Sequence, residues 1–388
     1  MSQENLQYPD LHSSPVTCRP TCGGARWLSS NNYSRGGILT LQQRFDPRLN
    51  ALNAIRLAMA LGVIVWHSFP LTGRDIAFHP LRQFIAEVWV DGFFAISGFL
   101  ITASWMRRPQ VRGYLVARAL RILPAFWICL LIVGFIVAPI GVAMQGGDGR
   151  GLLLSTAPIE YVLSNSAVWI FERGVDGTPT GVPYPGTWNG SLWTLGWEVL
   201  CYLGVLALGI TGLLKRRWTL PIAFAASWAL LAATTLADIG GHPGAAARFS
   251  IMFLAGALIY QFQGLIRCTW LLTAAAFGVT AATMFLPDYR LLGAVFWAYV
   301  VIATGALTQR ERLVLKNDIS YGVYIYAFPF QQLLYIKFGA IPTLAFAVLA
   351  AVPTLLAASA SWFAIEKPVM RLRARLDPAP AKVPAAAL

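Results

Sequence analysis

The sequence is short of charge, and of acidic residues in particular. Charged residues make up 12% of its 388 positions, about half the share of an average soluble protein, whereas 57% are hydrophobic. Lys and Arg number 30 and Asp and Glu only 17, which leaves a net charge of +13. Together with a mean hydropathy of +0.59, this composition excludes an ordinary soluble domain.

Cysteine and histidine are also too sparse to support two common kinds of site. The five cysteines are scattered, which excludes a disulfide framework. Cys18 and Cys22 form a C-x3-C pair in the polar N-terminal region, but no second Cys or His pair lies near them in the sequence, so we expect no metal site. The basic residues stand beside apolar segments, so nucleic acid is not an expected partner.

What the sequence has instead is a series of apolar runs of about twenty residues, separated by short basic or Gly/Pro-rich pieces. A bilayer admits only helices or closed barrels, and these runs lack the two-residue alternation of a barrel strand. The sequence therefore predicts an all-α, polytopic transmembrane helix bundle surrounded by membrane lipids. About ten spans are expected, near residues 51–70, 84–105, 122–143, 192–214, 219–238, 249–265, 270–286, 291–308, 319–337 and 341–364.

The basic residues also predict the orientation of this bundle. With the N-terminus inside, and leaving out Arg56, 22 Lys and Arg residues fall on the cytoplasmic side and 7 on the outer side. Both termini are therefore expected in the cytoplasm. Residues 1–43, which contain no apolar core long enough for a signal peptide, and residues 377–388 are predicted to be disordered cytoplasmic tails. Residues 44–376 are predicted to form the transmembrane domain.

One outer segment, residues 144–191, is much longer than the other connections. It is rich in Gly and Pro and carries Trp169, Tyr184 and Trp188. Long ordered loops often bind ligands, and aromatic side chains in a polar loop are suited to stacking on sugar rings. These three residues are therefore candidate substrate-binding residues, with an aromatic belt at the membrane interface as the alternative.

The first apolar run contains an arginine and a histidine. Arg56 and His67 are eleven residues apart, about 20° past three full helical turns, so both point from one helix face, roughly 16 Å apart. An ionisable side chain in a bilayer costs about 2.5–3.5 kcal/mol, so two on one face predict a polar cavity. Neutral imidazole is a good general base at neutral pH, which makes His67 the candidate base near the outer end of this span. A histidine that only packs is the alternative.

Two carboxylates inside predicted spans complete the candidate catalytic set. Asp91 lies near the outer end of the second span, at a depth similar to that of His67, where it could orient the imidazole. The alternative is a helix end at the membrane interface. Glu198 lies in the fourth span and demands a polar partner, either Arg56, His67 or an acceptor hydroxyl. A purely structural ion pair between Glu198 and Arg56 is the alternative.

Basic residues gather where the third span enters from the cytoplasm. Arg118 and Arg121 lie on one face of the predicted first turn of that span, and Arg108 and Arg112 precede them. Guanidinium groups bind phosphate bidentately, so these four residues are candidates for holding the phosphates of a ligand at an inner cavity mouth. The alternative is that they only set the topology.

Taken in order, these segments resemble the acyltransferase-3 family of integral-membrane acyltransferases, which includes bacterial O-antigen, exopolysaccharide and Nod-factor O-acetyltransferases. The resemblance covers residues 52–375, and its most specific element is the Arg-x10-His of Arg56 and His67. The other matching elements are D-x-F-F-x-x-S-G-F-L-I-T from Asp91, R-x-x-R of Arg118 and Arg121, S-L-W-x-L-x-x-E ending at Glu198, S-Y-x-x-Y from Ser320 to Tyr324, and I-E-K-P at 365–368.

The resemblance implies a multi-pass O-acyltransferase of the bacterial cytoplasmic (inner) membrane. It would move an acetyl group from cytoplasmic acetyl-CoA, the co-substrate, to a hydroxyl of a glycan or glycolipid on the outer side. It implies that His67 is catalytic with Arg56 as its partner, and that Arg118 and Arg121 hold the CoA phosphates.

Asp91 and Glu198, with Glu366 of the I-E-K-P element, match acidic positions of the family. We expect the pantetheine arm of CoA to run up a cavity along the Arg56 face towards His67.

The sequence departs from the family pattern in two places. Members often have Y-x-W-H after the S-Y segment, but here Tyr324 is followed by Ile325, Tyr326 and Ala327, so a mechanism that needs a second histidine fails. No hydrolase-type domain follows the tenth predicted span, so a separate periplasmic transferase would have to supply one if transfer requires it.

Several alternatives stay open from the sequence. The protein could instead be a transporter or flippase of a lipid-linked glycan or acyl precursor, or a structural partner in envelope-glycan assembly. For the enzyme, direct transfer and an acetyl-enzyme at His67 are both compatible with these residues.

Overall fold

The computed structural model describes residues 39–376, with side chains up to Arg371. Within that range the protein consists of helices and connections without a β-strand, and its extended pairings are two isolated bridges, Thr40 with Arg267 and Val175 with Thr178. The all-α prediction is therefore confirmed. The tail predicted at residues 377–388, and the first 38 residues of the N-terminal one, lie outside the described range.

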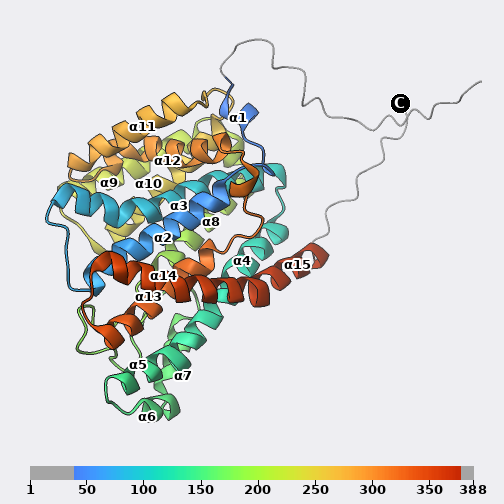
Figure 1. Cartoon of the computed structure of the whole chain (residues 1–388). Coiled ribbons are helices and arrows are strands. Elements are labelled where there is room, and N and C mark those ends of the chain that lie inside the picture. Colours follow the sequence, from blue (N-terminus) through green and yellow to red (C-terminus); the bar gives the residue numbers. More distant parts are fainter. Residues whose placement is uncertain (1–38, 377–388) are drawn as a thin grey trace, which may run out of the picture. The chain divides into compact units, whose positions relative to one another are not determined.

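Helical segments lie at all ten predicted spans (Figure 1). They are α2 (Leu52–Leu71), α3 (His79–Arg107), α4 (Val111–Ile132) continuing through a π-helical turn (Val133–Val137) into α5 (Ala138–Met144), α8 (Trp193–Ile210), α9 (Thr219–Leu236), α10 (Gly241–Gln261), α11 (Trp270–Ala282), α12 (Arg290–Leu307), α13 (Ser320–Phe338), and α14 (Thr343–Ser361) continuing through a second π-helical turn (Trp362–Glu366) into α15 (Lys367–Leu376).

Eight of the described helical segments are long and apolar enough to cross a membrane. The other two are α11, which is shorter, and α13, whose tyrosines and glutamines make it less apolar. α13 packs against α2 and α14, so its polar side chains face other helices rather than lipid.

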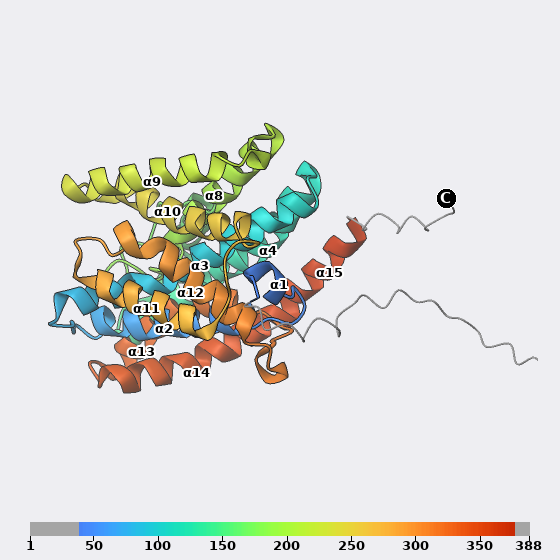
Figure 2. The same ribbon diagram turned by 90° about the horizontal axis from the view of Figure 1, so that it is seen from above.

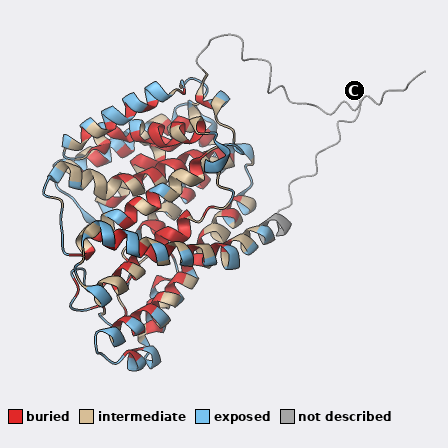
Figure 3. Cartoon of the chain, in the orientation of Figure 1, coloured by how far each residue is buried: buried red, intermediate tan, exposed pale blue. Residues whose placement is uncertain are grey.

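The helices lie side by side in layers. Seen from above, α9 and α10 lie towards one edge and α14 at the opposite edge, with α3 and α12 between them (Figure 2). Buried residues concentrate on α3, α10, α12 and α13 (Figure 3). Only 22% of the apolar stretch of α9 and 28% of that of the segment formed by α14 and α15 is buried inside the protein, which suits helices that face lipid.

Glycines let α3 and α10 cross at close range. A Cβ atom on Gly98 of α3 would lie 1.9 Å from the carbonyl oxygen of Phe253, and one on Gly256 of α10 would lie 1.9 Å from that of Ala95. Small residues at such a crossing bring two backbones together where burial of apolar surface contributes little. This crossing fixes α3, the helix that carries Asp91.

The start of α4 differs from the prediction. Pro109 disfavours a helical conformation at Arg108, so α3 ends there and a new helix begins at Val111. Arg118 and Arg121 therefore lie well inside α4 rather than in its first turn, which corrects the predicted position of this pair.

The long segment 144–191 is more ordered than a plain loop. It contains α6 (Gly149–Leu154) and α7 (Ala157–Asn165), and its longest irregular stretch begins at residue 166 and leads to α8. The side chain of Asp148 accepts a hydrogen bond from the Gly151 amide (2.7 Å) and so caps α6.

The boundary of the predicted N-terminal tail also changes. Leu41 is fully buried, and its amide donates to the carbonyl of Ile266 (2.7 Å), while the amide of Cys268 donates to the carbonyl of Leu39 (3.0 Å). Residues 39–43 are therefore part of the folded protein, because two leucines give this short stretch an apolar surface to bury.

The glycine crossing gives a testable prediction. Gly98→Ala should destabilise the protein by about 1–3 kcal/mol or more, because the new methyl group meets backbone that has no room to move. Gly278→Ala in α11 is the matched control, since nothing lies within 4 Å of its Cβ position. Thermal unfolding in detergent measures both. Equal melting temperatures for the two variants would contradict the close crossing.

Candidate active site

Four charged side chains meet at one end of the bundle, and we call them the Asp318 cluster: Arg56 of α2, Arg121 of α4, Asp318 before α13, and Glu366 of the second π-helical turn. Arg56 Nη1 and Arg121 Nη2 each lie 2.6 Å from Asp318 Oδ2, and Arg121 Nη1 lies 3.0 Å from Glu366 Oε2. None of the four exposes more than 20% of its side chain. Two cations and two carboxylates thus pair off inside the protein.

Asp318 is the centre of this cluster. Burial opposes its ionisation, but the guanidiniums of Arg56 and Arg121 outweigh that effect and hold the pKa of the carboxyl below its ordinary value of 3.8. Its other oxygen accepts hydrogen bonds from the Ser320 amide (3.2 Å) and hydroxyl (2.5 Å). Asp318 is therefore ionised at neutral pH and ties α2, α4 and the start of α13 together.

The π-helical turn Trp362–Glu366 completes the cluster. The guanidinium of Arg121 lies 5.7 Å from the centre of the Trp362 ring, and the Trp362 indole donates to Asn317 Oδ1 (3.1 Å). The wider turn thus lets Trp362 and Glu366 face α4 and the segment before α13 together. Such turns occur frequently at functional sites.

A small polar cavity lies beside the cluster, between α2, α3, α8 and α13. Its volume is about 40 Å³, enough for a few water molecules. Arg56, Glu198, Thr194, Tyr321 and Tyr324 supply its polar lining. A polar cavity therefore does lie beside Arg56, but His67 is not among the residues that line it.

Glu198 is held by hydroxyl groups. Its Oε1 accepts hydrogen bonds from Ser97 (2.9 Å) and Tyr202 (2.5 Å). Among the described residues it makes no ion pair, so neither Arg56 nor His67 is its partner. Glu198 reaches the cavity already hydrogen bonded, which lowers the cost of a carboxylate at this depth.

Arg118 of α4 lies close to Tyr202, the tyrosine that binds Glu198. Its guanidinium is 5.5 Å from the ring centre of Tyr114 and 5.9 Å from that of Tyr202, and Nη2 donates to Ser104 Oγ (2.8 Å). Because the Tyr202 hydroxyl also binds Glu198, one tyrosine connects Arg118 to the cavity.

The structure separates the roles of the four predicted phosphate-binding arginines. Arg121 is committed to two buried carboxylates, so Arg118 and Arg121 do not form one anion-binding pair. Arg108 caps the end of α3, and Arg112 is exposed in the first turn of α4.

Aromatic side chains lead from Arg56 towards His67. The Arg56 guanidinium lies 5.9 Å from the centre of the Phe93 ring, which meets Tyr324 edge to face at 5.8 Å. One turn further along α13, Phe328 meets the imidazole of His67 edge to face at 5.1 Å. These rings separate the cavity from His67 in this structure.

His67 has unpaired hydrogen-bonding capacity. Its Nδ1 is buried and has no partner. Ile64 and Ser68 flank His67 along α2. The side-chain amide of Gln331 donates to the carbonyl of Ile64 and to the hydroxyl of Ser68 (both 2.9 Å), and so connects α13 to α2. The neighbouring Gln332 amide donates to the carbonyls of Tyr184 and Thr187 (both 2.8 Å).

Further buried atoms without a partner lie on α13, which carries Phe328, and on the segment that packs against the Phe328 ring. A carbonyl only accepts, so the NH₂ groups of Gln331 and Gln332 must face those carbonyls, and their buried Oε1 atoms are left without a partner. Ser191 Oγ is also buried and unpaired, next to Gly190, which packs on the Phe328 ring. Buried polar atoms without partners cost free energy unless a ligand or water satisfies them.

Asp91 does not orient the imidazole, which corrects that prediction. It is fully buried and accepts hydrogen bonds from Arg248 Nε (3.1 Å), Arg290 Nε (2.6 Å) and the Tyr289 hydroxyl (2.6 Å). Arg248 is available to it because α10 begins at Gly241, earlier than predicted. Glu87 and Asp288 also bind these arginines. Both Asp91 oxygens are thus engaged, and Asp91 acts as a structural anchor between α3, α10 and α12.

The three aromatic residues of segment 144–191 have different surroundings. Trp188 is 0% exposed, packs against Gly141 and donates to Thr178 Oγ1 (2.9 Å), so it is a core residue and its predicted stacking role is wrong. Tyr184 is 38% exposed and meets Phe328 edge to face at 5.7 Å, and Phe328 is also the ring that contacts His67. Trp169 contacts α8 and α10 instead.

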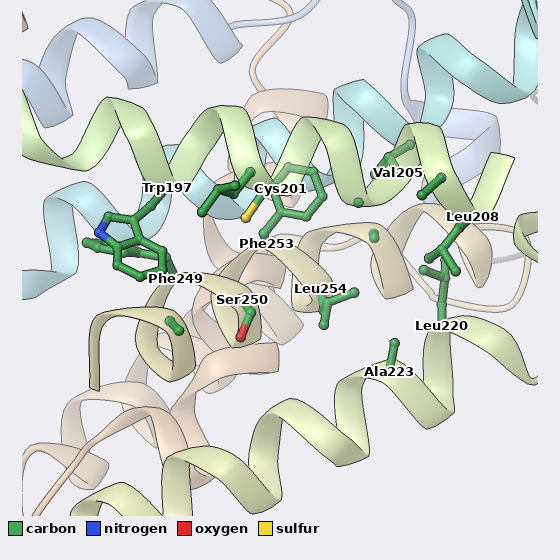
Figure 4. A pocket seen from close by; sticks show the side chains of 15 residues that line it. Trp197, Cys201, Val205, Leu208, Leu220, Ala223, Phe249, Ser250, Phe253 and Leu254 are labelled. Atoms are coloured by element: carbon green, nitrogen blue, oxygen red, sulfur yellow. The ribbon is translucent and has the colours of Figure 1, made fainter. Parts of the chain in front are cut away.

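Two apolar grooves lie on the sides of the bundle. One, of about 480 Å³, runs between α8, α9 and α10 from Trp197 to Leu208 (Figure 4). The other, of about 550 Å³, runs between α4 and α8 from Arg118 to Val168. Their almost wholly apolar lining suits lipid chains.

Within the described residues, no group of three or more His, Cys, Asp or Glu is arranged to hold a metal ion.

Comparison with known proteins decides the family. The model of the acyltransferase domain known as acyltransferase-3 matches residues 49–363. The chain belongs to this family. It is 26% identical over 343 residues to an O-acetyl transferase of Shigella phage Sf6, covering 82% of this chain and 95% of the phage protein. It is 28% identical over 359 residues to nodulation protein 10 of Rhizobium leguminosarum bv. viciae, covering 84% and 95%. No solved structure matches the chain.

With this family and its apolar helices, the protein is a multi-pass membrane O-acyltransferase, as the resemblance implies. Sequence reasoning missed Asp318, Gln331 and Gln332 in this acyltransferase. Asp318 lies two residues before the first serine of the S-Y-x-x-Y element, and a carboxylate next to an apolar run was the available signal. The glutamines had no comparable signal, because their spacing identifies no partner.

The Asp318 cluster gives the second prediction. Asp318→Asn leaves two buried guanidiniums without a full counter-charge and should destabilise the acyltransferase by about 3–5 kcal/mol. Asp75→Asn, which removes an exposed ion pair with Arg82, should change stability by less than about 1 kcal/mol. Chemical unfolding in detergent compares the two variants.

The pH dependence follows from the same carboxyl. Because the pKa of Asp318 is lowered on folding, its stabilisation is present above the ordinary value and is lost as pH falls through the lowered one. The wild type should therefore lose stability below about pH 4 more steeply than Asp318→Asn. Parallel acid profiles would show that the cluster is not ionised.

Proposed function

We propose that this acyltransferase moves an acetyl group from acetyl-CoA, bound at the Arg118 end of α4, to a hydroxyl of a glycan bound beside His67. The proposed orientation follows the basic residues, with the Asp318 cluster towards the cytoplasm and His67 towards the outer side. The glycan acceptor is consistent with the O-acetyl transferase name of the phage relative.

One observation carries this proposal: the unpaired polar atoms around His67 are mostly acceptors. The two glutamine Oε1 atoms can only accept, and Ser191 Oγ can accept as well. In neutral imidazole one ring nitrogen also accepts. A ligand rich in hydroxyl groups supplies the donors that all of these atoms lack, and a saccharide is such a ligand.

The proposed chemistry needs one general base. His67 takes the proton of the acceptor hydroxyl as its oxygen attacks the thioester carbonyl carbon, and a carbon–oxygen bond forms. The carbon–sulfur bond then breaks, and the CoA sulfur leaves with the proton that the imidazolium returns. Gln331 and Gln332 hold the acceptor through its other hydroxyls, while Tyr184 lies over the same place from the outer segment.

The donor is proposed to enter beside Arg118. Arg108, Arg112 and Arg118 lie near the junction of α3 and α4 and would hold the phosphates, while Arg121 holds the helices together through Asp318. Tyr202 and Glu198 connect Arg118 with the small cavity. Passage of the acyl group to His67 requires Phe93, Tyr324 and Phe328 to move.

The third prediction tests the base. His67→Ala should lower acetyl transfer by about 10²–10⁴-fold or more while the protein stays folded and inserted, because general-base help is lost. His79→Ala, at the exposed start of α3, is the control and should keep wild-type transfer. Transfer is followed as CoA release and as mass gain of the acceptor. A His67→Ala protein with the wild-type rate would refute the assignment.

The fourth prediction tests the donor site. The double variant Arg108→Gln/Arg112→Gln should weaken CoA binding at low salt, and the loss should shrink as ionic strength rises. Arg216→Gln, an exposed arginine between α8 and α9, should leave binding unchanged. Calorimetry with CoA measures both. Unchanged CoA affinity in the double variant would leave these arginines with a topological role only.

A further inference from the structure

A further pocket lies at the start of α8 and α10, and we call it the aromatic pocket. It has a volume of about 370 Å³, within the usual range for small-molecule sites. It is lined by Trp169, Ile170, Arg173, Trp193, Trp197, Gly241, His242 and Ala245. The acetyl-transfer scheme does not use it.

The pocket presents ring faces at angles to one another. The ring centres of Trp169 and Trp197 are 5.3 Å apart with planes tilted by 56°, and His242 lies 5.6 Å from Trp169 and 6.1 Å from Trp197. Trp193, at the rim, is 37% exposed. Amphipathic rings that leave faces open to water suit a ligand with an apolar face and polar edges, which describes a pyranose.

The charge of the pocket has one sign. Arg173 and His242 are its only ionisable lining residues, and both are exposed. Arg173 makes no ion pair with another described residue. The first turn of α10 also lines the pocket and adds the positive end of a helix dipole. An anionic group on the ligand would therefore be favoured here.

Specific contacts hold the loop and the Trp169 ring that form one wall of this pocket. Buried Asn165 donates to the Glu172 carbonyl (2.8 Å) and accepts from the Phe171 amide (2.9 Å), which shapes the loop that carries Trp169. Gly196 of α8 leaves the space that the Trp169 ring occupies, since a Cβ there would lie 2.7 Å from it.

Backbone strain marks the same loop. Val168 is buried and has a φ of 66°, a conformation that a β-branched residue rarely adopts. Such strain persists only where the surroundings enforce it, and it is concentrated at binding and catalytic sites. Val168 directly precedes Trp169, which lines the pocket.

We infer that the aromatic pocket binds a pyranose ring that carries an acidic group, with the indoles against the ring and Arg173 and His242 against the anion. The inference rests on the proposed function in one respect: this ring would belong to the glycan acceptor, while a hydroxyl of another residue of that glycan reaches His67. Segment 166–192 connects the two places, since Trp169 lies in the pocket and Tyr184 beside Phe328.

The test is direct binding to the full-length protein in phosphatidylcholine nanodiscs. The probes are methyl β-glucuronoside, the neutral methyl β-glucoside, and inorganic phosphate, measured by calorimetry. The acidic pyranoside should bind about tenfold tighter than either other probe, because it alone supplies both ring and charge. Arg173→Gln should remove its advantage over the neutral pyranoside, and Trp193→Ala should weaken both.

Two controls keep this test sharp. Phe171→Ala changes an exposed aromatic residue of the same loop that does not line the pocket, and it should bind like the wild type. His67→Ala should also bind like the wild type. Equal affinity for the two pyranosides, or an advantage that survives Arg173→Gln, would overturn the inference. Inorganic phosphate that binds as tightly as the acidic pyranoside would overturn it too, in favour of a site for a phosphate group.

Failure of the proposed function can be told apart from failure of the pocket. If no acyl transfer occurs to any glycan but Arg173-dependent binding persists, the pocket stands and the proposed function falls. If transfer depends on His67 and Arg173→Gln changes neither binding nor the KM for an acidic acceptor, the function stands and the pocket falls.

Discussion

The architecture of this acyltransferase depends on one buried interaction, the pairing of Asp318 with Arg56 and Arg121. It joins α2, α4 and α13 at a single carboxylate, and Glu366 adds the end of α14 through Arg121. Charges at such depth are costly unless paired, so the pairing selects one arrangement of these helices over others. The same arrangement fixes the direction of α2, and with it the positions of Arg56 at one end and His67 at the other.

The parts of the fold that follow from apolarity were predictable. The spans and the all-α class follow from run lengths, because a bilayer leaves the backbone few options. The polar cavity beside Arg56 follows from the cost of an ionisable side chain inside an apolar span. The hydrogen bonds and ion pairs between residues far apart in the sequence were not predictable in the same way. Asp91 and His67 have similar predicted depths, yet Arg248 and Arg290 engage both Asp91 oxygens. Depth along a helix says nothing about the direction in which a side chain leaves it.

The candidate site divides into a rigid end and an unsatisfied end. Around Asp318 the charges are paired and the carboxyl oxygens occupied, apart from Glu366 Oε1. Around His67 the glutamine oxygens, the Ser191 hydroxyl and the imidazole Nδ1 have no partners. This difference favours a structural role for the first end and a ligand-binding role for the second. Family resemblance alone proposes His67 as the catalytic residue, whereas the glutamines emerge only once α13 is seen packed against α2.

Acyl transfer from a donor at one face of the membrane to an alcohol at the other can be measured in proteoliposomes whose two faces are supplied separately. Protein is inserted in one orientation, with labelled acetyl-CoA supplied either on the face that exposes Arg112 or on the opposite face, and the glycan acceptor supplied separately on either face. Labelled glycan is expected only when acetyl-CoA is on the Arg112 face and the acceptor is on the other. Equal labelling with both substrates on the same face would contradict it.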